Sequence, residues 1–242
     1  MDKGDLVHKP RGTAEASLFP VQSHKYSYLE NPSASPMRDA APPPNVRPLV
    51  LIAIGGGGAS HGTHPGIDAF CLRHLPPAPV LGYVGTASGD DPGKSARVRA
   101  AFAPHELREL PMSADATAAA RWAEGLDMIH VGGGDPVRLL DHLRATGIDR
   151  VLVGAARRGV VLAGVSAGAM TPHASTEPDR IAAMAAHLAA GDLPAGWAID
   201  DGAALVMSVG APAGVFPADG PPRVHRIARD HAGGAATAVL TL

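Results

Sequence analysis

Cysteine is nearly absent from this chain of 242 residues, where Cys71 is the single example. One cysteine excludes a disulfide framework and a cysteine-rich zinc site. Aromatic residues make up only 4% of the chain, so a buried core has to consist mainly of Ala, Val, Leu and Ile. The length is nevertheless sufficient for one domain with a sizeable core.

The sequence also has neither a basic excess nor a long apolar run. Lys and Arg number 21 against 23 Asp and Glu, which argues against a protein held to nucleic acid by phosphate contacts. The best candidate for a membrane span, residues 151–170, is interrupted by Arg157 and Arg158, and no apolar segment follows the charged start MDKGDLVHKPRG. We therefore expect a soluble cytoplasmic protein with neither nucleic acid nor membrane as a partner.

Residues 1–47 differ in composition from the rest of the chain. They mix Ser, Pro, His and charged residues without a helical or strand period and end in PSASPMRDAAPPPNVRP. Such a segment buries too little apolar surface to offset the entropy lost on ordering. The sequence predicts a disordered Pro/Ser-rich extension over 1–47 and a single α/β domain over 48–242.

Within that domain, apolar runs alternate with glycine turns and helical stretches. The pattern predicts strands at 49–54, 80–88, 106–112, 128–131 and 159–165, with helices at 90–104, 116–125 and 136–147 between them. Strands that are apolar on both faces and alternate with helices indicate an α/β fold with a mainly parallel sheet flanked by helices. A further helix near 180–191 and short strands at 197–199, 203–209, 223–228 and 238–242 predict an antiparallel edge near the C-terminus, with a hairpin turn at residues 200–202.

Three glycine-rich loops, at 55–58, 132–134 and 164–168, follow predicted strands at the edge where parallel sheets bind ligands. The first two match neither G-x-G-x-x-G nor a P-loop, so no nucleotide or other cofactor is expected. The third, Gly164-Val165-Ser166-Ala167-Gly168, matches the G-x-S-x-G nucleophile elbow and lies directly after an apolar strand. This position predicts Ser166 as a nucleophile.

The elbow and the loop before it also carry a family resemblance. The segments VGGGDPVRLLDHLRATGID and GVVLAGVSAGAM, together with LIAIGGGG, GYVGTASGDD and LPAGWAIDDGAAL, resemble the dipeptidase E and cyanophycinase family of serine peptidases, which have a class I glutamine-amidotransferase-like fold. The resemblance covers residues 49–205. It implies Ser166 as the nucleophile, Gly133 or Gly134 with Ala167 as oxyanion-hole donors, and a small peptide substrate cleaved after an acidic residue without a metal or cofactor.

The sequence departs from that family in two places. Asp135 stands where the loop usually carries an amide, which places an acceptor at the substrate-binding loop. The larger departure follows Met170, where the segment that bears the acidic triad member in related chains is missing. By the family's register His173 becomes the general base and Arg180 the residue that binds the substrate carboxylate, because a planar guanidinium suits bidentate recognition.

The shortened segment leaves alternatives open. Seven residues of helix would place His173 about 10 Å from Ser166, and the acidic triad member has only Glu177, Asp179, Asp200 and Asp201 as nearby candidates. A catalytically impaired relative that acts as a binding protein is therefore the second hypothesis, and a general esterase is a weaker third. The pair His61 and His64 lacks a third ligand at metal-site spacing, so no metal is expected. A homodimer is compatible with such folds, although no segment of the sequence marks an interface.

Overall fold

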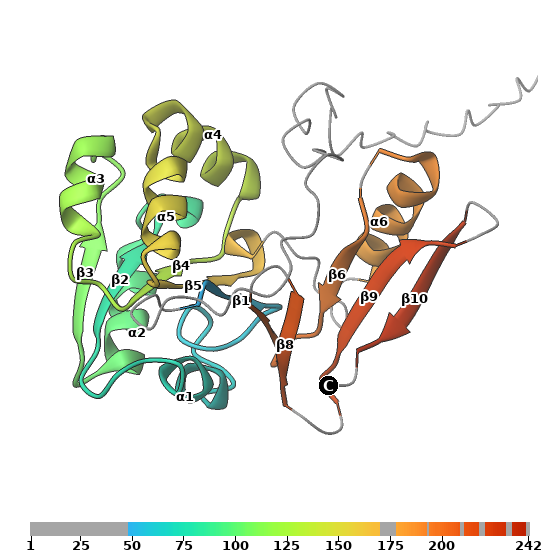
Figure 1. The fold of residues 1–242 in the computed structure, drawn as a ribbon, viewed down its shortest axis with the longest axis horizontal. Helices are drawn as coiled ribbons and strands as arrows, with labels where there is room; N and C mark the ends of the chain where they lie inside the picture. Colours follow the sequence, from blue (N-terminus) through green and yellow to red (C-terminus); the bar gives the residue numbers. More distant parts are fainter. Residues whose placement is uncertain are drawn as a thin grey trace, which may run out of the picture. The chain divides into compact units, whose positions relative to one another are not determined.

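The computed structural model describes residues 48–169, 178–192, 194–208, 211–217, 221–230 and 234–240. Its main sheet has seven strands in the order β3-β2-β4-β5-β1-β7-β8 (Figure 1). The five strands from β3 to β1 run parallel, and β7 and β8 continue the sheet in antiparallel fashion. The strands are β1 (Val50–Ile54), β2 (Val80–Val84), β3 (Glu106–Leu110), β4 (Met128–Val131), β5 (Val161–Val165), β7 (Ala204–Ser208) and β8 (Ala211–Phe216).

Helices cover both faces of this sheet (Figure 1). On one face, apolar side chains of α3, α4 and α5 pack against alternate residues of β2 and β4, such as Val84 and Ile129. On the other face, α1 and α2 pack against Ile52, Tyr83 and Met128. The helices are α1 (Gly66–Leu72), α2 (Pro92–Phe102), α3 (Ala116–Trp122), α4 (Pro136–Thr146) and α5 (Ile148–Arg157), with short 3₁₀ turns η1 (Thr86–Ser88) and η2 (Ser166–Gly168). The expected α/β fold with a mainly parallel sheet is confirmed.

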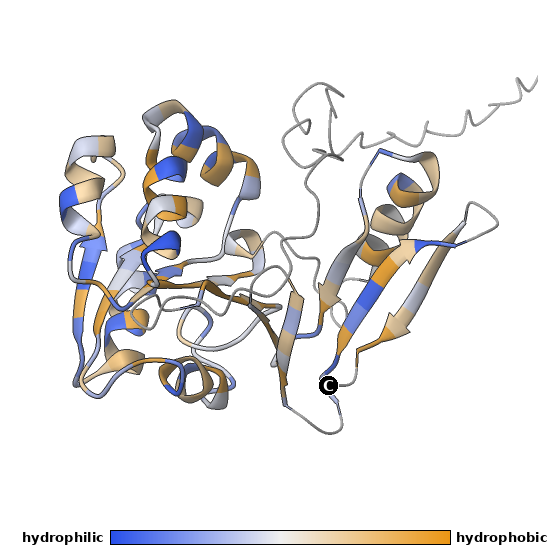
Figure 2. Cartoon of the chain, in the orientation of Figure 1, coloured by the Kyte–Doolittle hydropathy of each residue, from blue (hydrophilic) through white to orange (hydrophobic). Residues whose placement is uncertain are grey.

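The hydropathy colouring follows this layering (Figure 2). The central strands are apolar, whereas the edge strand β3 is largely hydrophilic. Among the helices that the structure describes, none combines the length and the apolar character of a membrane span.

A second sheet of three antiparallel strands, β10-β9-β6, comprises β6 (Gly196–Ile199), β9 (Val224–Arg229) and β10 (Ala235–Val239). The helix α6 (Pro178–Ala190) packs on it through Leu188 and Ile227. The expected antiparallel edge is therefore present, but residues 200–202 are not a hairpin turn, because β6 and β7 belong to different sheets. The two short apolar runs look like hairpin arms in the sequence, and only tertiary pairing separates them.

Side-chain caps define where several helices begin. Asp91, Asp115 and Asp135 each accept N–H groups from the first turn of α2, α3 and α4. Gly147 ends α4 in the left-handed conformation, as its position in the sequence predicts, and α5 follows immediately. The predicted extension over 1–47 lies outside the described residues.

Candidate active site

Ser166 occupies a strained turn at the carboxyl end of β5. Its φ of +53° is in the left-handed region, where a residue with a side chain loses roughly 1–2 kcal/mol. A Cβ on Gly164 would lie 2.3 Å from the carbonyl oxygen of Gly168, and a Cβ on Gly168 would lie 2.3 Å from that of Val131. Both glycines are therefore required by backbone contacts, and the segment has the geometry of a nucleophile elbow.

The loop Gly132–Gly134 lies beside this elbow because β4 and β5 are neighbours, with Val131 paired to Gly164. A Cβ on Gly133 would lie 3.3 Å from Cβ of Ser166, so the two loops are in contact. Gly134 has a φ of +154°, and a Cβ there would lie 2.2 Å from the carbonyl oxygen of Ala87. The glycines of this loop thus allow a close approach of backbone to backbone next to Ser166.

Three backbone N–H groups belong to the two loops that meet at Ser166 and are candidates for binding a ligand. Within the described part of the chain, the N–H groups of Gly133 and Gly134 have no hydrogen-bond acceptor. The N–H of Ala167 belongs to the first turn of η2, where a helix offers no internal acceptor. N–H groups of this kind can stabilise the negative oxygen that develops during acyl transfer.

Asp135 and Lys94 fix the position of the loop Gly132–Gly134 through hydrogen bonds. Asp135 Oδ1 accepts the N–H groups of Val137 and Arg138 at 2.8 and 3.1 Å, so this carboxylate caps α4. The Asp135 N–H donates to the carbonyl oxygen of Ala87 at 2.8 Å. The Nζ of Lys94, from the first turn of α2, donates to the carbonyl oxygen of Gly133 at 3.1 Å. No sequence motif indicates Lys94, because only the adjacency of β2 and β4 brings it to this loop.

His130 is the buried imidazole beneath the same loop. It is 2% exposed, and burial lowers the pKa of its side chain to about 4. Its Nε2 lies 3.4 Å from the hydroxyl of Ser60, its ring stacks on Tyr83, and its Nδ1 has no partner among the described residues. The imidazole of His130 is therefore neutral, and its packing in this apolar environment supports the glycine loop above it.

The first glycine loop flanks the elbow on the opposite side, because β1 pairs with β5 and Ile54 is aligned with Val165. Gly56 accepts the N–H of Gly202 at 2.9 Å, which ties this loop to the start of β7. His61 and His64 are exposed on the segment that follows. No group of three or more His, Cys, Asp or Glu side chains suited to a metal occurs in the described ranges.

Two predicted site residues cannot be placed in this geometry. His173 lies outside the described residues, and Arg180 belongs to the first turn of α6, with its side chain outside the description. Among the candidates for the acidic triad member, Asp200 accepts the N–H of Arg223 at 2.8 Å and lies 3.4 Å from the imidazole of His225. That carboxylate is therefore engaged within the second sheet region.

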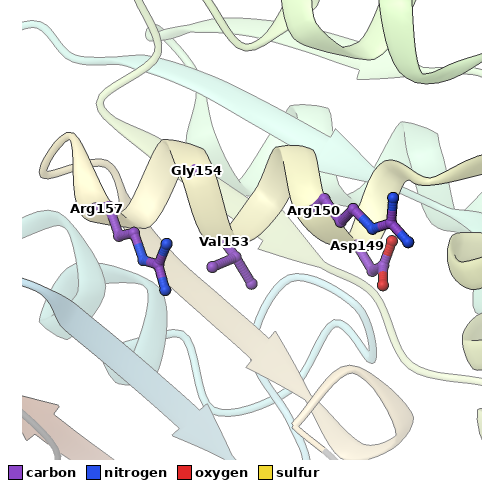
Figure 3. Close-up of a pocket in the computed structure, with 5 residues that line it drawn as sticks. All are labelled: Asp149, Arg150, Val153, Gly154 and Arg157. Atoms are coloured by element: carbon purple, nitrogen blue, oxygen red, sulfur yellow. The ribbon is translucent and has the colours of Figure 1, made fainter.

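The depression shown in Figure 3 is separate from these loops. It is lined by residues of α5 alone, and their side chains project from one face of the helix. It contains none of the predicted site residues, which are Ser166, His173, Gly133, Gly134, Ala167, Arg180 and Asp135. We therefore place the candidate site at the elbow and not at this surface.

Comparisons with known proteins indicate the family of this chain. The chain is 31% identical over 190 residues to the uncharacterized peptidase YgaJ of Bacillus subtilis (strain 168), a match that covers 64% of this chain and 81% of that protein. The crystal structure of a peptidase from an acI-B1 Actinobacterium matches with a TM-score of 0.60 at 20% identity, over 81% of this chain and 96% of that one, and shares the fold. Residues 51–187, which include the elbow and both neighbouring glycine loops, match the sequence pattern of Peptidase family S51. The chain therefore belongs to Peptidase family S51.

Proposed function

We propose that this chain is a serine peptidase that hydrolyses the peptide bond on the carboxyl side of an acidic residue, as in an Asp-X dipeptide. The observation that carries the proposal is the strained Ser166, at φ +53° between two glycines whose Cα atoms leave no room for a side chain. Strain of this size is kept only where the surrounding structure fixes it, and such residues cluster at active sites. Membership of a peptidase family supports the same conclusion.

The proposed reaction uses Ser166 Oγ as the nucleophile toward the scissile carbonyl carbon. His173 takes the hydroxyl proton and later donates it to the leaving amine, as general bases do in acyl transfer. The N–H groups of Gly134 and Ala167, with that of Gly133, bind the oxygen that becomes negative. Arg180 is proposed to bind the acidic side chain of the substrate, and Asp135 to border the pocket while it caps α4.

A second candidate is a binding protein that keeps the pocket but hydrolyses little. The observation in its favour is the short connection after the elbow, because η2 ends at Gly168 and α6 begins at Pro178. Few residues are available there to supply both a base and the acid that orients it. Losing the acid of a triad typically lowers turnover by orders of magnitude without removing it entirely.

The test is the hydrolysis of Asp-p-nitroanilide and of Asp-Leu by the full chain, with Ser166→Ala as its matched control. Labelling of Ser166 by a fluorophosphonate probe, located by mass spectrometry, is measured on the same samples. We expect turnover and labelling in the native chain and neither in Ser166→Ala. His173→Ala should then lower kcat, and Arg180→Met should raise KM for Asp substrates more than for Asn substrates.

Two outcomes would contradict the proposal. Equal rates in the native chain and in a folded Ser166→Ala variant would remove Ser166 as the nucleophile. Binding of Asp-Leu by calorimetry without hydrolysis or labelling would favour the binding protein.

A further inference from the structure

The Gly133–Gly134 peptide is mechanically unusual, because neither residue has a side chain to fix its orientation. Glycine adopts both signs of φ with little cost, so the intrinsic backbone preferences of these two residues do little to oppose rotation of such a peptide by half a turn. If the Gly134 N–H is an oxyanion donor, that rotation would put a carbonyl oxygen in its place. A negative oxygen would then meet another acceptor, and the oxyanion hole would lose a donor.

The structure holds this peptide by its carbonyl group. Lys94 Nζ donates to the Gly133 oxygen at 3.1 Å. In a trans peptide the C=O and the N–H point in opposite directions, so the Gly134 N–H faces away from the lysine. On the other side of Gly134, the Asp135 N–H is bound to Ala87, which fixes the next peptide.

Lys94 itself is well placed for this contact. It is the third residue of α2, and its N–H donates to the capping carboxylate of Asp91 at 2.7 Å. Pro92 occupies the first position of that helix, where its fixed φ suits the helical conformation. The backbone that carries Lys94 is therefore held on a capped helix end, and its side chain is half-buried.

We propose that Lys94 is a positioning residue for the oxyanion hole, which keeps the Gly133–Gly134 peptide oriented with the Gly134 N–H toward the oxygen of the tetrahedral intermediate. This inference rests on the proposed function. The ammonium group also polarises the peptide, because a hydrogen bond accepted by a carbonyl strengthens the N–H donor of the same amide. Both effects act in the transition state and leave substrate binding nearly unchanged.

The experiment compares Lys94→Met, Lys94→Arg and the matched control Arg97→Met in the full chain. Arg97 is an exposed cation one turn further along α2, so its removal changes the net charge of the chain equally. We expect Lys94→Met to lower kcat for Asp-p-nitroanilide by roughly 10- to 100-fold, below the 10²–10³ typical for loss of an oxyanion donor. KM should change less than twofold, and Arg97→Met should behave as the native chain.

Two further measurements separate positioning from a general structural effect. The affinity for a peptide boronic acid, which forms a tetrahedral adduct with the serine, should fall in parallel with kcat/KM. Lys94→Arg should recover most of the loss, because a guanidinium also donates to a carbonyl. An unchanged kcat in Lys94→Met would overturn the proposal. A raised KM at constant kcat would overturn it as well and would make Lys94 a substrate-binding residue.

A readout without turnover distinguishes failure of this inference from failure of the proposed function. If Ser166→Ala and the native chain hydrolyse equally, the peptidase proposal fails. The amide ¹⁵N–¹H resonances of Gly133 and Gly134 still report on the peptide. Lys94→Met should shift or broaden them, whereas Arg97→Met should not, and unchanged resonances in both variants would refute the role of Lys94.

Discussion

At the scale of single residues, the site is defined by where side chains are excluded. Gly164 and Gly168 are in contact with backbone carbonyls at distances that no Cβ can occupy. Between them, Ser166 is the one position in the elbow that carries a hydroxyl, and it does so in a conformation that favours glycine. Glycine, the residue best suited to this backbone conformation, would lack that hydroxyl.

This conflict predicts a difference in stability between two variants that lack the hydroxyl of Ser166. Ser166→Gly removes both the hydroxyl and the strain of the positive φ, whereas Ser166→Ala removes only the hydroxyl. We expect Ser166→Gly to unfold at higher urea concentration than Ser166→Ala, with a free energy of unfolding about 1 kcal/mol larger.

The measurement is equilibrium urea denaturation of both variants followed by circular dichroism, with the native chain as reference. Equal stability of the two variants would show that the elbow holds Ser166 without strain.

At the scale of elements, the sequence predicts the parallel core well and the C-terminal third less well. Runs such as VLIAI and MIHV are apolar on both faces and end at glycines, which is typical of buried parallel strands. The elbow is recognisable for the same reason, since its glycines and serine are adjacent in sequence. The assignment of β6 to a second sheet depends on its pairing with β9, which no local pattern indicates.

Local sequence patterns do not contain the pairing of strands, and for this reason some residues near the site have no signal in the sequence. Lys94 and Gly133 are 39 positions apart and meet only because β2 and β4 are neighbours in the sheet. The helix α5 (Ile148–Arg157) begins directly after Gly147, and the sequence pattern predicts no helix there. Contacts across strands require the topology, which local periodicity does not contain.

The start of α4 links helix capping to the glycine loop of the candidate site. Asp135→Ala removes the acceptor for two N–H groups, which costs about 1 kcal/mol of stability. Asp115→Ala removes a cap of α3 that accepts one N–H group, and it serves as the matched control. Both variants should lose similar stability in urea denaturation, but only Asp135→Ala should also lower kcat, because Asp135 directly follows Gly134.

Asp135→Asn tests the charge separately from the cap, because asparagine caps helices about as well as aspartate. We expect it to retain the stability of the native chain. A loss of kcat in Asp115→Ala equal to that in Asp135→Ala would remove the link between the cap and the loop.

At the scale of the whole molecule, the main sheet and the second sheet share apolar contacts. Ile199 and Val224 from the second sheet cluster with Leu205 of β7. The glycine loops, the elbow and His130 instead belong to the carboxyl ends of β1, β4 and β5, which lie in the middle of the main sheet. The candidate site is thus supported by the buried centre of the main sheet. Conditions that destabilise this centre should reduce activity and stability together.

Acid is one such condition, because burial lowers the pKa of His130 from 6.5 to about 4. In the unfolded chain this imidazole gains a proton as the pH falls through about 6.5, whereas in the folded chain it stays neutral until the pH nears 4. The unfolded state therefore binds more protons across this window, and the free energy of unfolding decreases as the pH falls. At ~1.4 kcal/mol per pH unit, the contribution of His130 to that loss is on the order of 3 kcal/mol.

The variant His130→Gln has a neutral polar side chain that does not titrate in this window. Its free energy of unfolding should decrease less steeply than that of the native chain between pH 6.5 and 4, measured by urea denaturation at several pH values. The matched comparison is His142→Gln, which replaces a partly buried histidine of α4, measured beside the slope of the native chain. If His130→Gln shows the same pH dependence of the free energy of unfolding as the native chain, protonation of His130 costs the folded protein little. The apolar environment beneath the glycine loop would then not oppose that protonation.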